Sequence, residues 1–452
     1  MSVHSSVVTA SPSLAPTLAV QLRHAADCVR AVEKGQSLGD ALPRVPEALR
    51  PGVQALAFHV LRHLGAARAA LQALAPRKPE APVQALLHSA LALLVSDEPT
   101  PGASYAPHTV VDQAVEAAKL SRGTQRAAGF VNAVLRRWLR ERSELLVRLQ
   151  KQPVARWNHP AWWIDRLRTD HPDGWEAVLA ANNRPGPMTL RINRRRIARS
   201  DYQQRLTEQG LASRVVGEDG LELLDARPVS ALPGFEQGWF AVQDAAAQMA
   251  APLLLAGRTW SPADRVLDAC AAPGGKTAHL LEHADLDLLA LDVDARRCER
   301  IRENLQRLGL VAEVKAADAG RPADWWDGLP FDAILLDAPC TASGIVRRHP
   351  DVRWLRRPGD VEQLAQIQQT LLEALWPLLK PGGRLLYATC SVFRAEGASQ
   401  VAAFLARHSD AVAGPAPGHL LPGNAGRNGE FADNPSGGQD GFFYARLDKR
   451  AP

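Results

Sequence analysis

The sequence predicts a protein of three parts: an all-α bundle, a small connecting α+β region, and a C-terminal α/β domain built on a parallel sheet. Three observations lead to this prediction. The chain has 452 residues, which is more than one hydrophobic core usually supports. Its first third repeats apolar residues at helical spacing, and its last half alternates short apolar runs with helical stretches. We expect a flexible tail over residues 1–19, the bundle over 20–150, the connecting region over 151–235 and the α/β domain over 236–452.

The N-terminal part is rich in Ala, Leu and Arg and contains few strand-like runs. Its apolar residues recur every three or four positions, which predicts amphipathic helices that each bury one face. The expected helices lie near 53–64, 83–95, 108–119 and 125–139. The basic end of the last helix carries Arg136, Arg137, Arg140 and Arg142. These arginines fit either cations near a helix C-terminus on a solvated face or a patch that contacts phosphates.

Composition indicates the class of protein and its surroundings. A net charge of +5 and a pI near 9.1 favour a polyanionic partner without deciding it. No apolar run approaches the roughly 18–20 residues that span a bilayer, so we expect no contact with a membrane. Five scattered cysteines argue against a disulfide framework and fit a reducing cytoplasm. Because these cysteines lack paired ligand spacing with His, the sequence predicts no metal site. We also expect a monomer.

The connecting region carries a dense basic run, Leu190-Arg-Ile-Asn-Arg-Arg-Arg196. Alternating apolar and polar residues before three consecutive arginines predict a short strand that leads into a cationic loop. Arginines in such a loop can pair with phosphates and stack on unpaired bases. A solvated basic loop would have the same sequence, so both interpretations stay open.

Five strand-like segments alternate with helical stretches in the C-terminal domain. They lie at 265–269, 288–292, 312–316, 331–337 and 383–390. This alternation predicts a parallel sheet covered by helices on both faces, and ligands of such sheets bind beyond the carboxyl ends of the strands. The polar residues at or just past those ends are Asp268, Asp292, Asp318, Asp337 and Cys390. The sequence therefore predicts a functional site at this edge of the sheet.

The turn after the first of these strands indicates the kind of ligand. It ends in Gly275-Lys-Thr277 like a phosphate-binding P-loop, but Cys270 stands where that pattern needs a glycine. The dinucleotide pattern G-x-G-x-x-G is absent as well. The two glycines of the turn instead let the backbone approach a ligand closely. Asp292 is placed to accept hydrogen bonds from ribose hydroxyls, and Asp318 could receive an adenine amino group. These features predict a nucleoside-containing cofactor.

Three motifs carry a resemblance to a known family: Asp268-Ala-Cys-Ala-Ala-Pro-Gly-Gly-Lys276, Asp337-Ala-Pro-Cys340 and Thr389-Cys-Ser391. They resemble the motifs of the RNA cytosine-C5 methyltransferases, which use S-adenosylmethionine and carry two cysteines. The similarity continues through 242–244, 344–354 and 440–445. Upstream, Gly129–Arg137 resembles the last helix of the NusB-type RNA-binding bundle. A NusB-like domain ahead of such a methyltransferase is the layout of bacterial enzymes that act on cytosine 967 of 16S rRNA.

This resemblance, which covers about residues 20–450, implies a Rossmann-like domain that binds S-adenosylmethionine. It implies a 16S rRNA substrate with a single-stranded or loop cytosine as target. The residues implied to line the cofactor are Cys270, Ala271, Ala272, Pro273, Gly274, Gly275, Lys276, Asp292 at the ribose, Asp318 near the adenine and Asp337 near the methionine end. Asp337 is also implied to lie near the target base. Cys390 matches the nucleophile of the family, and Cys340 matches the second thiol, which assists product release.

The chemistry explains why these residue types are needed. C5 of cytosine is a poor nucleophile, but a thiolate added at C6 makes C5 enamine-like and able to take a methyl group. A free thiol is mostly protonated at neutral pH, so its thiolate needs a favourable neighbour, for which Lys276 is a candidate. Asp337 could hydrogen-bond the cytosine ring, or it could simply cap the turn after its strand. The target base must leave its stack, which costs least in unpaired RNA.

Some features depart from the family pattern or extend it. Gly397 follows Glu396 where the family usually has Asn, and two alanines in 245–247 replace the usual Glu and Ser. A basic segment follows Cys340, and its members are expected to contact phosphates and bases. They are Arg347, Arg348, His349, Arg353 and Trp354.

Three other functions stay open at this point. The first is methyl transfer to another RNA, such as tRNA. The second is a DNA cytosine methyltransferase, in which Cys340 would be the nucleophile; the additional thiol at position 390 and the helical N-terminal part oppose it. The third is a non-catalytic RNA-binding or assembly factor, which the presence of both thiols and of every acidic strand-end residue opposes.

Overall fold

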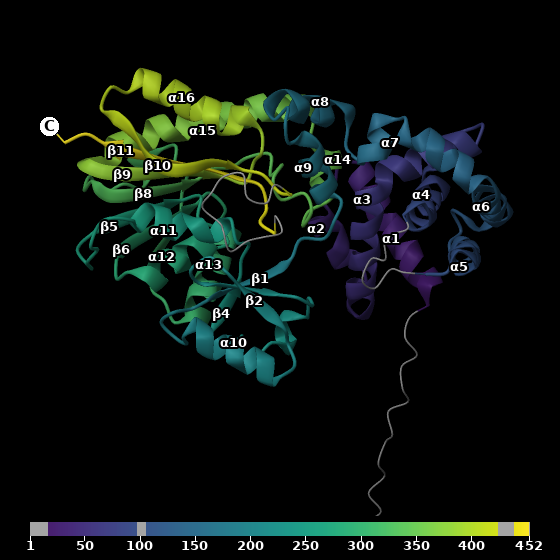
Figure 1. Cartoon of the computed structure of the whole chain (residues 1–452), viewed down its shortest axis with the longest axis horizontal. Helices are drawn as coiled ribbons and strands as arrows, with labels where there is room; N and C mark the ends of the chain where they lie inside the picture. Colours follow the sequence, from purple (N-terminus) through teal and green to yellow (C-terminus); the bar gives the residue numbers. More distant parts are fainter. Residues whose placement is uncertain (1–16, 97–104, 424–437, 452) are drawn as a thin grey trace, which may run out of the picture. The chain divides into compact units, whose positions relative to one another are not determined.

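Helices alone build the first of two structural units, whereas the second combines helices with two sheets (Figure 1). The computed structural model describes residues 17–96, 105–423 and 438–451. The units comprise residues 1–158 and 159–452. Most of the predicted tail lies outside the described residues, although its last two positions already belong to the first helix. Within the described ranges, no helix is long and apolar enough to cross a membrane.

The first unit confirms the predicted all-α bundle. Its helices are α1 (Leu18–Glu33), α2 (Leu38–Ala41), α3 (Arg50–Leu74), α4 (Ala81–Val95), α5 (Pro107–Lys119), α6 (Ala128–Gln150) and α7 (Pro153–Trp157). The apolar stripe of α3, including Val53, Leu56 and Leu64, is buried, as its spacing predicts. Helix α7 packs on α3, and the Asn158 side chain accepts a hydrogen bond from Ala66 N at 2.9 Å. This packing places the end of the unit at residue 158.

The arginines at the end of α6 have partners within the bundle. Arg137 pairs with Glu141 one turn later at 2.9 Å, and Arg142 donates to the Leu94 carbonyl at 3.4 Å. The first of these is an exposed pair of the kind that stabilises an isolated helix only slightly. The geometry of these two side chains therefore matches a solvated helix face.

The second unit begins with a small antiparallel sheet. Its elements are α8 (Ala161–Asp170), α9 (Trp175–Asn182), β1 (Met188–Ile192), α10 (Arg199–Glu208), β2 (Ser213–Val216), β3 (Gly220–Leu223) and β4 (Phe240–Val242). The strand order is β2-β3-β1-β4. Strand β1 contains the strand predicted ahead of the basic run, and its apolar residues Leu190 and Ile192 are buried under α10 together with Tyr202.

The arginines of the basic run are exposed, but each has a partner within the unit. Arg194 pairs with Glu218, Arg195 pairs with Asp285, and Arg196 donates to the Leu308 carbonyl. In contrast, Arg191 inside β1 is fully buried and makes two hydrogen bonds, of 2.7 and 2.9 Å, to Glu282. The small sheet is thus joined to the larger one by a buried ion pair.

The large sheet has seven strands in the order β10-β11-β9-β8-β5-β6-β7. The strands are β5 (Arg265–Ala269), β6 (Asp287–Asp292), β7 (Glu313–Ala316), β8 (Phe331–Asp337), β9 (Leu379–Thr389), β10 (Ala411–Leu420) and β11 (Phe442–Lys449). Strands β5 to β9 pair in parallel, whereas β10 and β11 run antiparallel at one end. This confirms the predicted α/β domain, and all five predicted strands are present.

One prediction about this sheet is wrong. The Gly-, Pro- and Asn-rich composition of the stretch from about 413 to 440 predicts a long surface loop, but the first part of this stretch belongs to strand β10. Proline is tolerated there because β10 is an edge strand, where one row of N–H groups needs no partner. The ladder also shifts register between Gly414 and Gly418. Of the rest of the stretch, residues 424–437 lie outside the described residues.

Helices cover both faces of the large sheet (Figure 1). They are α11 (Ala250–Leu255), α12 (Gly275–His283) and α13 (Ala295–Leu308) on one face, α15 (Pro358–Leu375) and α16 (Ala398–Arg407) on the other, and the short α14 (Val352–Leu355). Separate hydrophobic cores fill the two layers, one around Val266 and Ile301 and the other around Leu336 and Phe404. The sheet is therefore buried on both sides, which leaves its strand ends as the place for a ligand.

Candidate active site

The predicted site residues lie along one edge of the large sheet in a definite order. Asp318 follows β7, Asp292 ends β6, Asp337 ends β8, and Cys390 directly follows β9. Because the strands run β7-β6-β5-β8-β9, these side chains form a row at the carboxyl edge, with the β5–α12 loop at its centre. The two thiols lie at one end of the row and Asp318 lies at the other.

The loop between β5 and α12 is tied to the neighbouring strand. Ala271 N donates to the Leu291 carbonyl at 2.7 Å, and Ala272 N donates to the Asp292 carboxylate at 3.2 Å. Gly274 adopts a φ of +92°, and a Cβ there would come within 3.0 Å of the Ile301 side chain. A glycine is therefore needed at this position both for the backbone conformation and for space.

Burial disfavours the charged forms of two groups beside this loop. Burial raises the pKa of Asp268 to about 7, although a 2.6 Å hydrogen bond from Thr277 opposes the shift. Its other carboxyl oxygen is buried and has no hydrogen-bond partner in the described part of the chain. Burial and the surrounding aspartates raise the pKa of Cys270 to about 12, so its thiolate is disfavoured at neutral pH.

Lys276 and Asp337 form an ion pair next to the thiols. Lys276 Nζ lies 2.7 Å from Asp337 Oδ2, and its ammonium lies 5.3 Å from the centre of the Phe442 ring. Burial lowers the pKa of Lys276, but Asp337 and a negative charge on Cys390 outweigh it and raise the pKa above its usual value. The side chain therefore stays cationic beside the two cysteines.

The two thiols are in contact. Cys340 Sγ lies 3.3 Å from Cys390 Sγ, and both side chains are half-buried. The hydrogen bond to Cys390, followed by burial, raises the pKa of Cys340 well above its usual range. The thiolate form of Cys340 is thus disfavoured, and its S–H can donate the hydrogen bond to the Cys390 sulfur.

A single buried carboxylate connects the two cysteine loops. Glu396 Oε1 accepts a hydrogen bond from Thr341 N at 2.8 Å, next to Cys340. Glu396 Oε2 accepts one from Ser391 Oγ at 2.6 Å, next to Cys390. The Thr341 hydroxyl and Gln368 Nε2 also donate to this carboxylate. Burial raises the pKa of Glu396, and these hydrogen bonds oppose the shift.

Gly397, which departs from the family pattern, is closely packed. A Cβ at this position would lie 2.6 Å from the His419 ring and 2.7 Å from the Phe443 ring. No side chain fits here unless these rings move. In this chain the position contributes close packing behind Glu396 and offers no amide to the site.

The basic segment after Cys340 does not form an open RNA-binding face, which corrects our expectation for two of its arginines. Arg347 is 4% exposed and pairs with Asp440, and Arg353 is fully buried and donates to the Asn182 carbonyl. Arg348 pairs with Asp440 at 2.5 Å and with Asp244 at 2.8 Å. Arginine is well suited to such buried pairs, so its presence does not by itself indicate phosphate binding. His349 is exposed and Trp354 is half-buried.

The structure brings some predicted residues into contact and keeps others apart. Direct contacts join Lys276 to Asp337, Cys340 to Cys390, and the loop backbone to Asp292. Asp318 follows β7 and is exposed. Among the described contacts, its carboxylate accepts one hydrogen bond, from the nearby Gly320 N. The sequence did not indicate the bridging role of Glu396. Its only signal was its place in the motif that follows Cys390.

Comparisons with known proteins decide the family. Family models match residues 18–140 (NusB family), 159–230 (ferredoxin-like domain of RsmF/B-like methyltransferases) and 259–448 (16S rRNA methyltransferase RsmB/F). A ribosomal RNA small subunit methyltransferase B from Cronobacter sakazakii is 42% identical over 433 residues, which cover 93% of this chain and 96% of the relative. The chain belongs to the 16S rRNA methyltransferase RsmB/F family.

Two further comparisons agree with membership of the RsmB/F family. The ribosomal RNA small subunit methyltransferase B of Pseudomonas syringae pv. tomato is 48% identical over 333 residues, which cover 72% of this chain and 73% of the relative. The crystal structure of a methyltransferase homologue from Pyrococcus horikoshii is 27% identical, with a TM-score of 0.54, and covers 66% of this chain and 97% of that one. The family models confirm the predicted NusB-like bundle and Rossmann-like methyltransferase domain, and they match the connecting α+β region to a ferredoxin-like domain.

Proposed function

We propose that this RsmB/F family member transfers a methyl group from S-adenosylmethionine to C5 of a cytosine in 16S rRNA, through a transient bond between Cys390 and C6. The resemblance assigns cytosine 967 as the target. The observation that carries the proposal is the pair of thiols, whose sulfur atoms are 3.3 Å apart. They lie next to the Lys276–Asp337 ion pair, at the carboxyl edge of the large sheet where a nucleoside-containing cofactor is expected. The coarser activity, rRNA methylation, follows from the family.

The row of strand-end residues fits such a cofactor. Each Asp292 oxygen accepts one backbone N–H, from Ala272 or Asp294. Arg297 also lies 3.4 Å from Oδ2, so Oδ1 is the oxygen that keeps a lone pair for a ribose hydroxyl. Asp318 is exposed on the adjacent strand, where an adenine amino group would lie. In this arrangement Asp337 would hold the methionine end of the cofactor. S-adenosylmethionine, when bound, supplies an electrophilic methyl group.

The thiol pair and its neighbours supply the nucleophile. Lys276 and the Cys340 thiol both favour negative charge on Cys390. The Cys390 thiolate adds to C6 of the extruded cytosine and forms a carbon–sulfur bond, which places the ring's electron pair on C5. C5 would then take the methyl group as the sulfur–methyl bond of the sulfonium breaks, with S-adenosylhomocysteine as the leaving group. A base such as a water molecule would take the C5 proton while the carbon–sulfur bond to Cys390 breaks, which restores the aromatic ring, and the Cys340 thiol is placed to assist that release.

Asp337 is placed to act on the target base. One carboxylate oxygen accepts a hydrogen bond from Lys276, and the side chain remains 28% exposed toward the site. The second oxygen can accept a hydrogen bond from the amino group of the cytosine, which orients C6 toward the sulfur. Asp337 thereby connects the ammonium that favours the thiolate with the base that the thiolate attacks.

The proposal is tested with purified chain, methyl-labelled S-adenosylmethionine and 16S rRNA or tRNA lacking the modification. We expect label in 5-methylcytidine from 16S rRNA, and no label with Cys390→Ala. Cys28→Ala is the matched control, because Cys28 is a buried thiol of the helical unit. Label in another nucleoside, label in tRNA only, or full activity of Cys390→Ala would contradict the proposal.

A further inference from the structure

Two histidines and an aspartate form a cluster outside the site described above. His279 and His283 lie one turn apart on α12 and therefore share a face of that helix. Asp219 lies in the turn between β2 and β3. Asp219 Oδ2 is 3.0 Å from His279 Nε2 and 2.7 Å from His283 Nε2, and the two nitrogens are 3.1 Å apart. Three atoms of the kinds that bind metals therefore converge on one point.

We propose that Asp219, His279 and His283 bind one divalent transition-metal ion, with Zn²⁺ as the best match. Neutral imidazole nitrogen and carboxylate oxygen are the ligand types that Zn²⁺ uses. Tetrahedral bonds of about 2.0–2.1 Å place ligand atoms about 3.3 Å apart, so the cluster has to open by only a few tenths of an ångström. This proposal departs from the sequence-based expectation of no metal site, which considered only the cysteines.

The charges around the cluster are compatible with a cation. Burial lowers the pKa of His279 to about 3, which keeps its ring neutral as a metal ligand must be. Hydrogen bonds from the two histidines, working against burial, hold the pKa of Asp219 below its usual value. The nearby ion pairs, Arg191 with Glu282 and Arg194 with Glu218, are each neutral overall. With Asp219 ionised and His279 neutral, these two groups together carry one negative charge.

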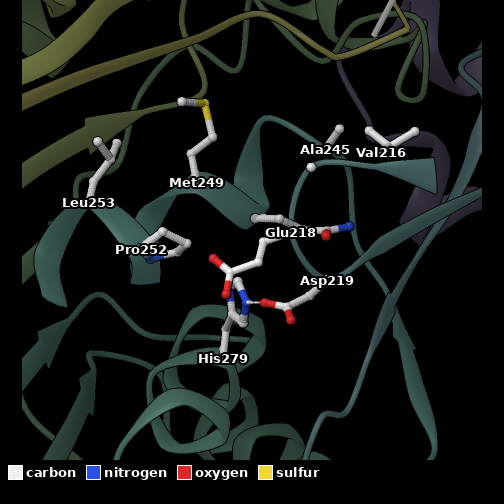
Figure 2. Close-up of a pocket in the computed structure, with 10 residues that line it drawn as sticks. Val216, Glu218, Asp219, Ala245, Met249, Pro252, Leu253 and His279 are labelled. Carbon is white, nitrogen blue, oxygen red and sulfur yellow. Dashed lines mark hydrogen bonds and ion pairs between the residues drawn. The ribbon is translucent and has the colours of Figure 1, made fainter. Parts of the chain in front are cut away.

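A cavity of about 320 Å³ lies beside the cluster (Figure 2). Its walls include His279 and Asp219 on one side and the apolar side chains of Met249, Pro252 and Leu253 on the other. Three protein ligands leave the fourth tetrahedral position open, and this cavity provides room for a water molecule there. Figure 2 also shows the Glu218 carboxylate directed toward the same part of the cavity.

Arg194 makes the proposal testable in a second way. Its Nη1 lies 3.0 Å from His283 Nδ1, and its Nε lies 3.7 Å from Asp219. A guanidinium only donates, so His283 Nδ1 accepts and the proton is on Nε2 in this arrangement. Metal binding through Nε2 moves that proton to Nδ1, and Arg194 must then turn away. Removing Arg194 should therefore tighten metal binding, whereas removing a ligand should weaken it.

The ion would stabilise a junction within the second unit. It would join α12, which begins at the β5–α12 loop, to the small sheet, next to the buried pair of Arg191 and Glu282. Since that pair already joins the two parts, the chain is expected to fold without the ion. His279 Nδ1 has no hydrogen-bond partner among the described residues. Ligand histidines normally have one, so we expect affinity about 10–100-fold below that of a fully supported site.

The test uses the full chain, freed of any affinity tag and treated with a chelator, titrated with Zn²⁺ and with Co²⁺. We expect one equivalent of Zn²⁺ to bind, a visible spectrum of tetrahedral Co²⁺, and a melting temperature that rises with Zn²⁺ concentration. His283→Gln should lose at least tenfold in affinity, and Arg194→Gln should gain affinity. Circular dichroism checks that each variant is folded.

The thiol pair of the active site could also bind a soft cation, so Cys340→Ser with Cys390→Ser is the matched control and should bind Zn²⁺ as the unmodified chain does. The proposal fails if the unmodified chain binds no stoichiometric ion, if His283→Gln binds as tightly as the unmodified chain, or if only the cysteine variant loses binding. This readout needs no RNA and no methyl transfer, so it is independent of the proposed function.

Discussion

Glu396 offers the sharpest test of how the active site is held together. Its carboxylate accepts four hydrogen bonds, and two of the donors, Thr341 N and Gln368 Nε2, cannot act as acceptors. Glu396→Ala would leave an N–H of each buried without a partner. At about 1–3 kcal/mol for each group, the loss is about 2–6 kcal/mol, compared with the roughly 5–15 kcal/mol that stabilise a domain.

The same substitution should also lower the catalytic rate, because the loops of Cys340 and Cys390 both depend on Glu396. A displacement of about 1 Å in a reacting group can cost roughly 100-fold in rate. We expect that loss for Glu396→Ala in the rate of covalent trapping by RNA that contains 5-azacytidine. Glu396→Gln keeps one carbonyl oxygen that can accept from Thr341 N and Gln368 Nε2. We therefore expect its free energy of unfolding to fall by less than about 1.5 kcal/mol and its trapping rate to fall by less than about tenfold.

Urea denaturation and single-turnover trapping measure the two effects. The control is Glu299→Ala, because the Glu299 side chain is 65% exposed and, among the described residues, pairs with Arg302 alone, one turn away. If Glu396→Ala matched this control in stability and trapped RNA at the unmodified rate, the bridging role assigned to Glu396 would be wrong.

Three further predictions concern charged groups around the site. Asp268 has a folded-state pKa raised from 3.8 to about 7 by burial, so its stabilising contribution is present at low pH and is lost as the pH rises through 7. The unfolding free energy of the unmodified chain should therefore fall between pH 5 and 8 by about 3 kcal/mol more than that of Asp268→Asn, as measured by urea titrations at each pH. Arg347→Ala should lower the unfolding free energy by about 3 kcal/mol, because it breaks a buried pair with Asp440, and should leave the salt dependence of RNA binding unchanged. Lys276→Met should slow covalent trapping about tenfold at pH 7, and the deficit should shrink at higher pH, where the thiolate forms without help.

Each of these has a result that would contradict it. An unchanged pH profile for Asp268→Asn would mean that the carboxyl is not buried as a neutral group. If RNA binding by Arg347→Ala depended less on salt concentration than binding by the unmodified chain, Arg347 would have to contact a phosphate after all. A pH-independent deficit for Lys276→Met would show that the ammonium acts on something other than the thiolate.

Much of the fold could be predicted because its signals are local. The five parallel strands are short apolar runs that end in polar residues, and all five are present where they were expected. The edge strand β10 was missed because its Gly and Pro content is typical of loops. Only its pairing with β11, which lies beyond residue 440, makes it a strand. Such pairing depends on residues far away in the sequence, and a local pattern does not contain it.

The candidate site was predictable in its residue types but not in its supporting contacts. Asp337 ends strand β8 and Cys390 directly follows β9, so their common edge follows from topology alone. The buried pairing of Arg347 with Asp440 joins residues almost a hundred positions apart, and the sequence alone suggested a solvent-facing arginine instead. The histidine cluster was missed for a similar reason. His279 and His283 share a helical face, but Asp219 reaches them only through the tertiary fold.

The most direct test of the central claim identifies which sulfur bonds to the RNA. The unmodified chain is trapped on a 16S rRNA fragment that carries 5-azacytidine at the target position, digested, and analysed by mass spectrometry for the peptide that retains the nucleotide. The account predicts the adduct on Cys390, its loss in Cys390→Ala and its persistence in Cys340→Ala. An adduct on Cys340, or none on either cysteine while 5-methylcytidine still forms, would contradict it.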